Sequence, residues 1–203
     1  MSPLRLRWQR MLRPLPRSAV RTACLDRVFQ LCDLLFLFDS YERVSNLLSS
    51  CIRPLSESEV NLLYPIFGDS VPYHRIRLDE RARIGPRRYG LIYVSFHTIN
   101  SWGPIPLPIL VHEVVHVWQY VNRGAIYIPR ALAAQRSRMG YDYGGLEGLR
   151  GAYSLDDFNY EQMAALVEDA YRLEQGLPLR YLAAPTPEAR RLLRGFTRKL
   201  KSG

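Results

Sequence analysis

Apolar residues recur every three or four positions along the first part of the chain, the spacing of one helix face. Over residues 18–50 this series runs through Val20, Cys24, Val28, Leu31, Leu35 and Phe38. A second helical pattern begins at Val44 and continues through Leu47 and Leu48. Residues 1–17 are instead rich in proline and arginine, and we expect them to be irregular.

The middle of the chain changes to the shorter period of β-structure. Ser56 and Glu59 form the S-x-x-E pattern of a capping box, which predicts a short helix ending near Phe67. After this helix, residues 73–78 alternate polar and apolar side chains, and residues 90–96 (GLIYVSF) are typical of a more buried strand. These segments predict a small sheet of about two to three strands.

Three further helices are expected in the second half of the chain. One covers residues 108–122 and stops at Gly124, and another covers residues 129–139. Asp156 or Asp157 is placed to cap a third helix that runs to about Gln175. The whole pattern therefore predicts an α+β fold that is mostly helical.

Length and composition indicate one main domain with additional segments. The chain has 203 residues and 47% hydrophobic content, enough for one well-packed core. We assign residues 1–51 to a basic, helical extension, 52–180 to the main domain and 181–203 to a basic tail. No apolar run approaches the ~20 residues that span a bilayer, and the first segment lacks the apolar core of a Sec export signal.

The net charge of +9 is concentrated at the two ends of the chain. Residues 1–25 hold six arginines and no acidic residue, and six more cations lie between Arg190 and Lys201. Such ends could contact nucleic acid, an anionic membrane or an acidic partner. Because the two runs have few interleaved aromatic residues, Trp8 in the first and Phe196 in the second, we expect solvated ends and no nucleic-acid partner.

The cysteines do not form a recognisable framework. There are three of them, Cys24, Cys32 and Cys51, and their spacing is not that of a zinc knuckle. We expect free thiols in the core and no disulfide.

The candidate chemistry lies in the H-E-x-x-H sequence of His112, Glu113 and His116. Histidines four residues apart on a helix project from the same face, so their two imidazoles can hold one metal ion. Glu113 lies beside them without having to bind the metal. The competing interpretation is a buried helix with two incidental histidines, but half of the chain's four histidines stand here. The pattern predicts a zinc site.

A catalytic zinc usually has three protein ligands and one open position, so a third ligand must come from elsewhere. Glu161 and Glu168 lie on one face of the helix expected after residue 157, too far apart to share one ion. Glu168 has Arg172 as a partner four residues on, whereas Glu161 has Ala165 at that place. We favour Glu161, with His97 and His74 as alternatives.

Several segments resemble the VgrG-related zinc metallopeptidase family, whose domains occur alone or fused to spike proteins of type VI secretion. The resemblance spans about residues 52–177 and rests on R-P-L-S-x-x-E at 53–59, F-G-D at 67–69, the segments 73–78 and 91–93, V-H-E-V-V-H-V-W-Q at 111–119, Y-D-Y at 141–143, N-Y-E-Q-x-A at 159–164 and V-E-D at 167–169. Met163 departs from the family pattern, which often has a second glutamine there. The resemblance implies a minimal zincin in which Glu161 is the third zinc ligand.

These features together predict a zinc metalloendopeptidase of the gluzincin type. His112, His116 and Glu161 would bind Zn²⁺, and Glu113 would act as the general base on a zinc-bound water. The donor that stabilises the oxyanion stays open among four tyrosines, Tyr141, Tyr143, Tyr153 and Tyr160. The substrate would be a protein or peptide, which could pair with an exposed edge of the strand at 90–96.

The resemblance also implies a biological setting. It suggests a monomeric type VI secretion effector or toxin with a VgrG-like spike or another secretion component as partner, held in the bacterial cytoplasm until delivery to a target periplasm or a host. A different class of function is a catalytically silent module of a secretion apparatus in which the zinc helix is only structural. Glu113 favours the enzyme, because a structural zinc site needs no general base. A DNA-associated metalloprotease is a third possibility that would use the basic ends.

Overall fold

The computed structural model describes residues 3–12, 23–49, 51–83 and 86–201. The α-helices of this part of the chain are α1 (Pro3–Leu12), α2 (Ala23–Leu34), α3 (Leu37–Leu48), α4 (Glu57–Phe67), α5 (Pro86–Tyr89), α6 (Leu107–Arg123), α7 (Tyr127–Gln135), α8 (Gly145–Gly151), α9 (Tyr160–Glu174) and α10 (Pro187–Lys201). The strands are β1 (Ile52–Pro54), β2 (Arg77–Asp79), β3 (Tyr93–Ser95) and β4 (Thr98–Asn100). The prediction of a mostly helical α+β fold with a small sheet is confirmed.

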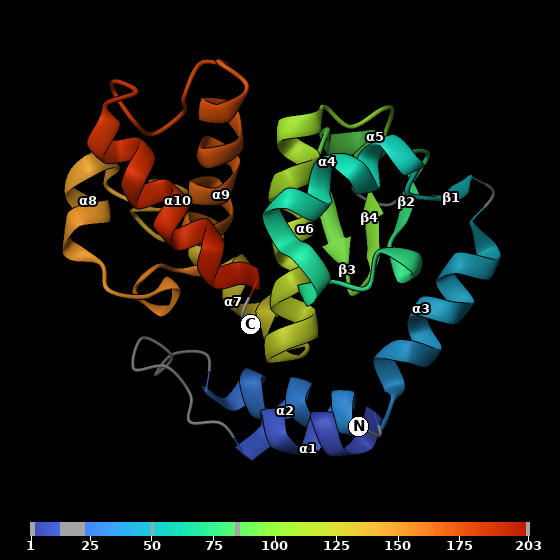
Figure 1. The fold of residues 1–203 in the computed structure, drawn as a ribbon. Coiled ribbons are helices and arrows are strands. Elements are labelled where there is room, and N and C mark those ends of the chain that lie inside the picture. The colour runs from blue at the N-terminus through green and yellow to red at the C-terminus, as the bar shows by residue number, and fades with distance from the viewer. Residues whose placement is uncertain (1–2, 13–22, 50, 84–85, 202–203) are drawn as a thin grey trace.

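The sheet has four strands in the order β1-β2-β4-β3, one more than the sequence predicted (Figure 1). β2 and β4 are parallel, and both outer pairs are antiparallel. Two expected strands had the wrong bounds. Tyr73–Arg75 forms a 3-10 turn in which the Arg75 amide donates to the Pro72 carbonyl, so β2 begins only at Arg77. The second segment ends at a turn in which Phe96 has a φ of 61°, and β4, which was not predicted, follows this turn.

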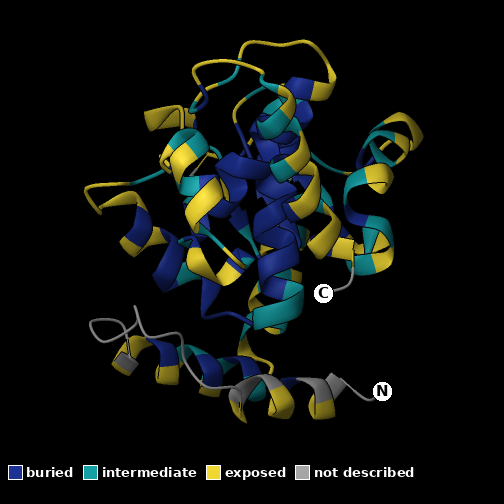
Figure 2. Cartoon of the chain, turned by 60° about the vertical axis from the view of Figure 1, so that its left-hand side comes forward, coloured by how far each residue is buried: buried dark blue, intermediate teal, exposed yellow. Residues whose placement is uncertain are grey.

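Helix α6 lies between the sheet and α9 and forms the centre of the core (Figure 1). Every residue from Leu110 to Tyr120 is buried, so this helix is covered on all sides. Its apolar residues include Val111, Val114 and Val115, which are fully buried. Figure 2 shows the buried residues gathered in the middle of the main body, with exposed residues on the outer helices and loops.

The C-terminal segment is a packed helix, so the expectation of a solvated tail is wrong. α10 contacts α9, α4 and α8, and it buries Ala189, Leu193, Phe196 and Leu200. The indole Nε1 of Trp118 on α6 donates to the carbonyl of Leu200 at 3.0 Å. The cations of this segment lie between its apolar positions, so its basic composition concealed an amphipathic helix.

The N-terminal segment is also helical in the residues that the structure describes. Residues 3–12 form α1 where irregular chain was expected, and residues 13–22 lie outside the described part. The next stretch forms two helices as expected, α2 and α3, but their boundary was wrong, because the chain turns at Phe36 and α3 begins at Leu37 instead of Val44. Cys24, Cys32 and Cys51 are free thiols as expected, but the expected core position is wrong, because Cys24 is exposed and the other two are half-buried. Within the described residues, the structure contains no helix of the length and apolarity that a bilayer crossing requires.

Candidate metal centre

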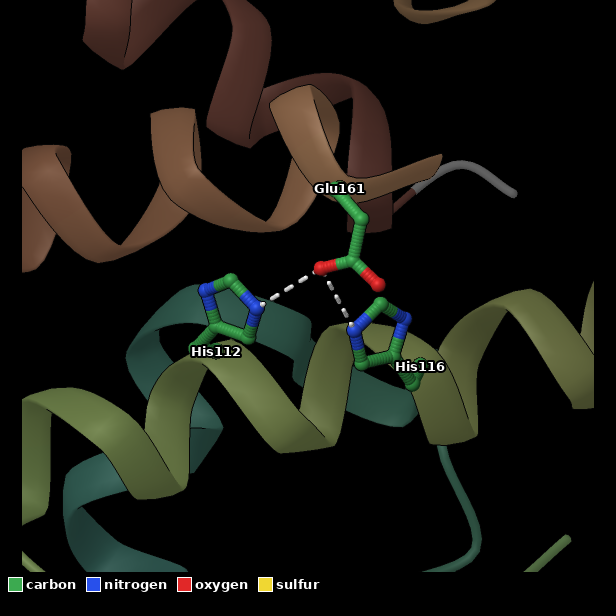
Figure 3. A group of neighbouring side chains, drawn as sticks. All are labelled: His112, His116 and Glu161. Atoms are coloured by element: carbon green, nitrogen blue, oxygen red, sulfur yellow. Dashed lines mark hydrogen bonds and ion pairs between the residues drawn. The ribbon is translucent and has the colours of Figure 1, made fainter. Parts of the chain in front are cut away.

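The H-E-x-x-H residues occupy the middle of α6. Pro106 and Pro108 start this helix, and the Gly124 amide closes it by donating to the Tyr120 carbonyl. His112 and His116 project from the same side, toward α9 (Figure 3). Both side chains are 7% exposed, which leaves them shielded from bulk water.

The first turn of α9 supplies the facing carboxylate. Asn159 caps this helix, and its side-chain oxygen accepts hydrogen bonds from the amides of Glu161 and Gln162 at 2.9 and 2.8 Å. The expected caps Asp156 and Asp157 belong instead to a separate 3-10 turn, Leu155–Asp157, that Ser154 caps. The Asn159 cap fixes Glu161 at the second helical position, with its side chain aimed at α6.

Three ligand atoms converge between the two helices. Oε2 of Glu161 lies 3.3 Å from Nε2 of His112 and 3.4 Å from Nε2 of His116 (Figure 3). Each of these three buried residues offers one imidazole nitrogen or carboxylate oxygen that could bind a metal, and these three atoms all lie within 4.8 Å of one another. Two imidazole nitrogens and one carboxylate oxygen are the donor set of a His₂Glu zinc site. The residues present therefore fit a zinc ion.

The alternative third ligands lie elsewhere. His97 is buried, but its Nδ1 pairs with Glu42 at 3.1 Å and its ring packs against Tyr120. His74 is exposed in the turn before β2. Neither belongs to the group around His112 and His116. Of the three candidates for the third ligand, Glu161 is the one that lies beside these histidines.

A second layer of polar side chains contacts the three candidate ligands. Glu168 forms the expected ion pair with Arg172 at 2.8 Å, and its other oxygen lies 3.2 Å from Nδ1 of His112. Oε1 of Gln119 lies 2.8 Å from Nδ1 of His116, and the amide of Gln135 donates to Oε1 of Glu161 at 2.9 Å. Contacts of this kind orient metal-binding side chains.

The sequence reasoning missed most of this second layer. The sequence predicted only an ion pair with Arg172 for Glu168. This residue nevertheless stands two helical turns after Glu161 on the same face, so it can also reach α6. Gln119 was part of the motif at 111–119 and was given no contact. Gln135 comes from α7, and no local pattern in the sequence places it beside Glu161.

Burial and the paired charges set the protonation of the site. Burial alone would lower the pKa of His112, but the carboxylates of Glu161 and Glu168 outweigh it and raise that pKa to about 9. Burial alone would raise the pKa of Glu161, yet His116 and His112 hold it far below its usual range. Burial raises the pKa of Glu113, although the two histidines oppose this. A carboxyl with a raised pKa is suited to take and return a proton near neutral pH.

The four candidate tyrosines lie in different surroundings. Tyr143 donates its hydroxyl to Asp169 at 2.7 Å, which gives it a structural role. Tyr153 is 88% exposed. The ring of Tyr141 lies 5.8 Å from that of His112, and the hydroxyl of Tyr160 is buried without a hydrogen-bond partner among the described residues. Of these four tyrosines, Tyr141 has a ring contact to a candidate ligand, and Tyr127, which was not a candidate, has one to His116 at 6.5 Å.

Comparison with known proteins gives one relative. The type VI secretion system spike protein VgrG2b of Pseudomonas aeruginosa is 27% identical to this chain over 136 residues. The match covers 61% of this chain but only 13% of the spike protein. No protein-family model and no solved structure matches the chain.

Proposed function

We propose that this protein is a zinc-dependent metallopeptidase that hydrolyses peptide bonds in a type VI secretion-related setting. The observation that carries the proposal is the convergence of His112, His116 and Glu161 next to the buried carboxyl of Glu113. A zinc ion bound there would polarise the scissile carbonyl and lower the pKa of a bound water toward ~7.

The chain's own residues would then do the following work. Glu113, with its raised pKa, takes a proton from the attacking water and returns it to the leaving amine. Glu168 and Gln119 keep the rings of His112 and His116 in place by contacting their Nδ1 atoms, while Gln135 holds the outer oxygen of Glu161. Tyr141 is the first candidate for the oxyanion donor, because its ring lies against His112.

The similarity to a spike protein supports the secretion-related part of the proposal. The protein would act as an effector or toxin, with a VgrG-like spike or another secretion component as its partner. The chain matches only a small part of that relative, so delivery and partner belong to the proposal. The alternative is a silent module, in which the same helix pair serves only to hold the fold together.

Metal content and cleavage separate these two functions. The purified protein should contain about one zinc per chain and should cleave an unstructured protein such as casein. Glu113→Gln should keep the zinc and lose the cleavage, because it removes the base and leaves the three ligands. His116→Ala should lose both. Zinc at full occupancy in His116→Ala would refute the site, and cleavage that survives Glu113→Gln would refute the mechanism.

The effector part of the proposal has its own test. Expression with an added export signal should slow bacterial growth, whereas cytoplasmic expression should be tolerated, since a protease harms a cell only where its substrate lies. Glu113→Gln expressed in the same way is the control and should be harmless at equal protein levels. Harm that persists in this variant would show that the toxicity comes from binding and not from hydrolysis.

A further inference from the structure

The three N-terminal helices expose apolar side chains to solvent. α1 presents Leu4, Trp8 and Leu12 at four-residue intervals, with exposures of 54, 50 and 65%. Val28 and Leu31 in α2, and Leu35 directly after it, are each more than half exposed. We call these six residues the N-terminal apolar surface. Large apolar side chains gathered in this way normally mark a site of interaction.

Helix α2 contacts the body of the protein through three buried polar residues, together with Phe29, which is partly buried against the core. Asp26, Gln30 and Asp33 are buried, while the apolar residues that predicted this helix face solvent. Asp26 forms a buried ion pair with Arg130 of α7 at 3.1 Å. This is the reverse of the usual arrangement for a surface helix, which buries its apolar stripe. The exposure is therefore built into the way the helix is attached.

The acidic residues of these helices all point away from solvent. The described parts of α1, α2 and α3 contain four acids, and the side chains of Asp26, Asp33, Asp39 and Glu42 are 0, 5, 18 and 12% exposed. Their partners are Arg130, Arg7 and His97. The exposed charges on the same helices are the arginines Arg5, Arg27 and Arg43. The outer side thus combines apolar residues with cations.

We propose that α1, α2 and α3 form a peripheral binding surface for membranes that carry anionic phospholipid. Leucine, valine and tryptophan side chains can enter the boundary between headgroups and acyl chains, and arginines beside them attract lipid phosphates. A protein partner with both acidic and basic surface residues would not require every acid on these helices to be turned away from solvent. Charge complementarity therefore favours an anionic lipid surface. The absence of acids in residues 1–25 agrees with it, as do the arginines of this stretch other than the buried Arg7.

Ion pairs fix both α2 and α3 to the domain that carries the candidate metal centre. The Asp26–Arg130 pair joins α2 to α7, which also supplies Gln135 to Glu161. The Glu42–His97 pair joins α3 to the turn before β4. Membrane binding through the N-terminal apolar surface would therefore hold the whole folded domain at the lipid surface.

Vesicle binding by the full-length chain tests this proposal without reference to zinc or peptidase activity. The protein should co-sediment with vesicles of phosphatidylcholine and phosphatidylglycerol and much less with phosphatidylcholine alone. Leu31→Glu should weaken this binding about tenfold, since it removes apolar area that would be buried in the lipid and adds a negative charge that anionic headgroups repel. Leu91→Glu is the matched control, because Leu31 and Leu91 are both 54% exposed and Leu91 lies outside these helices.

Tryptophan emission gives a second reading of the same surface. Trp8 and Trp102 are both 50% exposed, so each reports on its own face of the molecule. Anionic vesicles should shift the emission to shorter wavelength, and Trp8→Phe should remove this shift while Trp102→Phe keeps it. Equal binding to neutral vesicles, or no binding to either, would overturn the proposal. So would concentration-dependent dimerisation that Leu31→Glu abolishes in a protein without vesicle binding, which would assign the surface to a second copy.

Discussion

At the scale of single residues, the candidate metal centre distinguishes two carboxylates that stand on the same face of α9. Glu161 faces the Nε2 atoms of both histidines, whereas Glu168 faces only Nδ1 of His112 and also pairs with Arg172. A zinc ligand and an orienting residue thus differ in which imidazole nitrogen they approach. The difference can be measured, because the two roles predict different losses of metal affinity.

Glu161→Ala and Glu168→Ala should weaken zinc binding to different degrees. Loss of Glu168 removes an orienting contact and should cost about tenfold to hundredfold in affinity. Loss of Glu161 removes one of three ligands and should cost well over about a hundredfold. Competition with a chelating dye measures both affinities. Equal losses, or the reverse order, would show that the ligand comes from the other turn of α9.

The metal-free protein should lose stability as pH rises. The folded-state pKa of His112 is raised from 6.5 to about 9, so its protonated form is favoured by folding. This contribution is fully present below about pH 6.5 and is lost as pH rises through about 9. Urea unfolding in EDTA across this window should show the decline. Zinc binding requires neutral imidazole and should tighten over the same window, by at most about tenfold per pH unit for one proton released.

His112→Gln is the control for this pH effect. It removes the titrating ring, so the urea midpoint of the metal-free variant should change much less between pH 6.5 and 9. A wild-type midpoint that stays level across the window, or that rises with pH, would contradict the assignment to His112.

At the scale of elements, local rules in the sequence predicted the helices that carry the site. The H-E-x-x-H spacing placed His112 and His116 on one face, and α6 begins one residue before and ends one after its predicted bounds. The N-terminus of α9 was missed because Asp156, Asp157 and Asn159 are all good caps, and only Asn159 is followed by Gln162 for a reciprocal bond. Which face of α2 would be buried was not predictable, because its partner Arg130 lies far along the chain.

The Asn159 cap should matter both for stability and for the metal. Asn159→Ala should cost about 1 kcal/mol, the usual effect of losing a cap. Because the same side chain holds the amides of Glu161 and Gln162, zinc affinity should also fall. Ser154→Ala removes the cap of the neighbouring 3-10 turn and is the control, since it should leave the metal untouched. Zinc affinity that falls equally in both variants would refute the role given to Asn159.

A close approach between backbones explains one glycine of α8. A Cβ at Gly148 in α8 would lie 1.8 Å from the carbonyl oxygen of Tyr143. Gly148→Ala should therefore force these segments apart and lower the unfolding temperature, with a loss of several degrees. Gly151→Ala in the same helix meets no atom within 4 Å and is the matched control. An unchanged unfolding temperature in Gly148→Ala would contradict the packing of α8.

At the scale of the whole molecule, the two basic ends serve different structural purposes. The N-terminal helices attach through buried ion pairs and the half-buried Phe29 and Phe38 and keep most of their other large apolar residues exposed. In contrast, α10 attaches through an apolar face and keeps its cations outside. Composition alone could not distinguish them, since both ends are rich in arginine. The distinction comes from the spacing of apolar residues relative to the partner surface, which only the folded chain supplies.

The C-terminal helix should therefore be required for the fold that positions the zinc ligands. α10 packs against α9, which carries Glu161, and its Leu200 carbonyl accepts a hydrogen bond from Trp118 of α6, which carries both histidines. Phe196 is buried against Phe158 with ring centres 5.3 Å apart, so Phe196→Ala should cost about 3–5 kcal/mol. Arg191→Ala, at an exposed position of the same helix, should change stability by less than about 0.5 kcal/mol. Denaturant unfolding of the two variants measures both effects. A Phe196→Ala protein as stable as the Arg191→Ala protein would mean that α10 is only an appendage, and the zinc ligands would then have to be held by α6 and α9 alone.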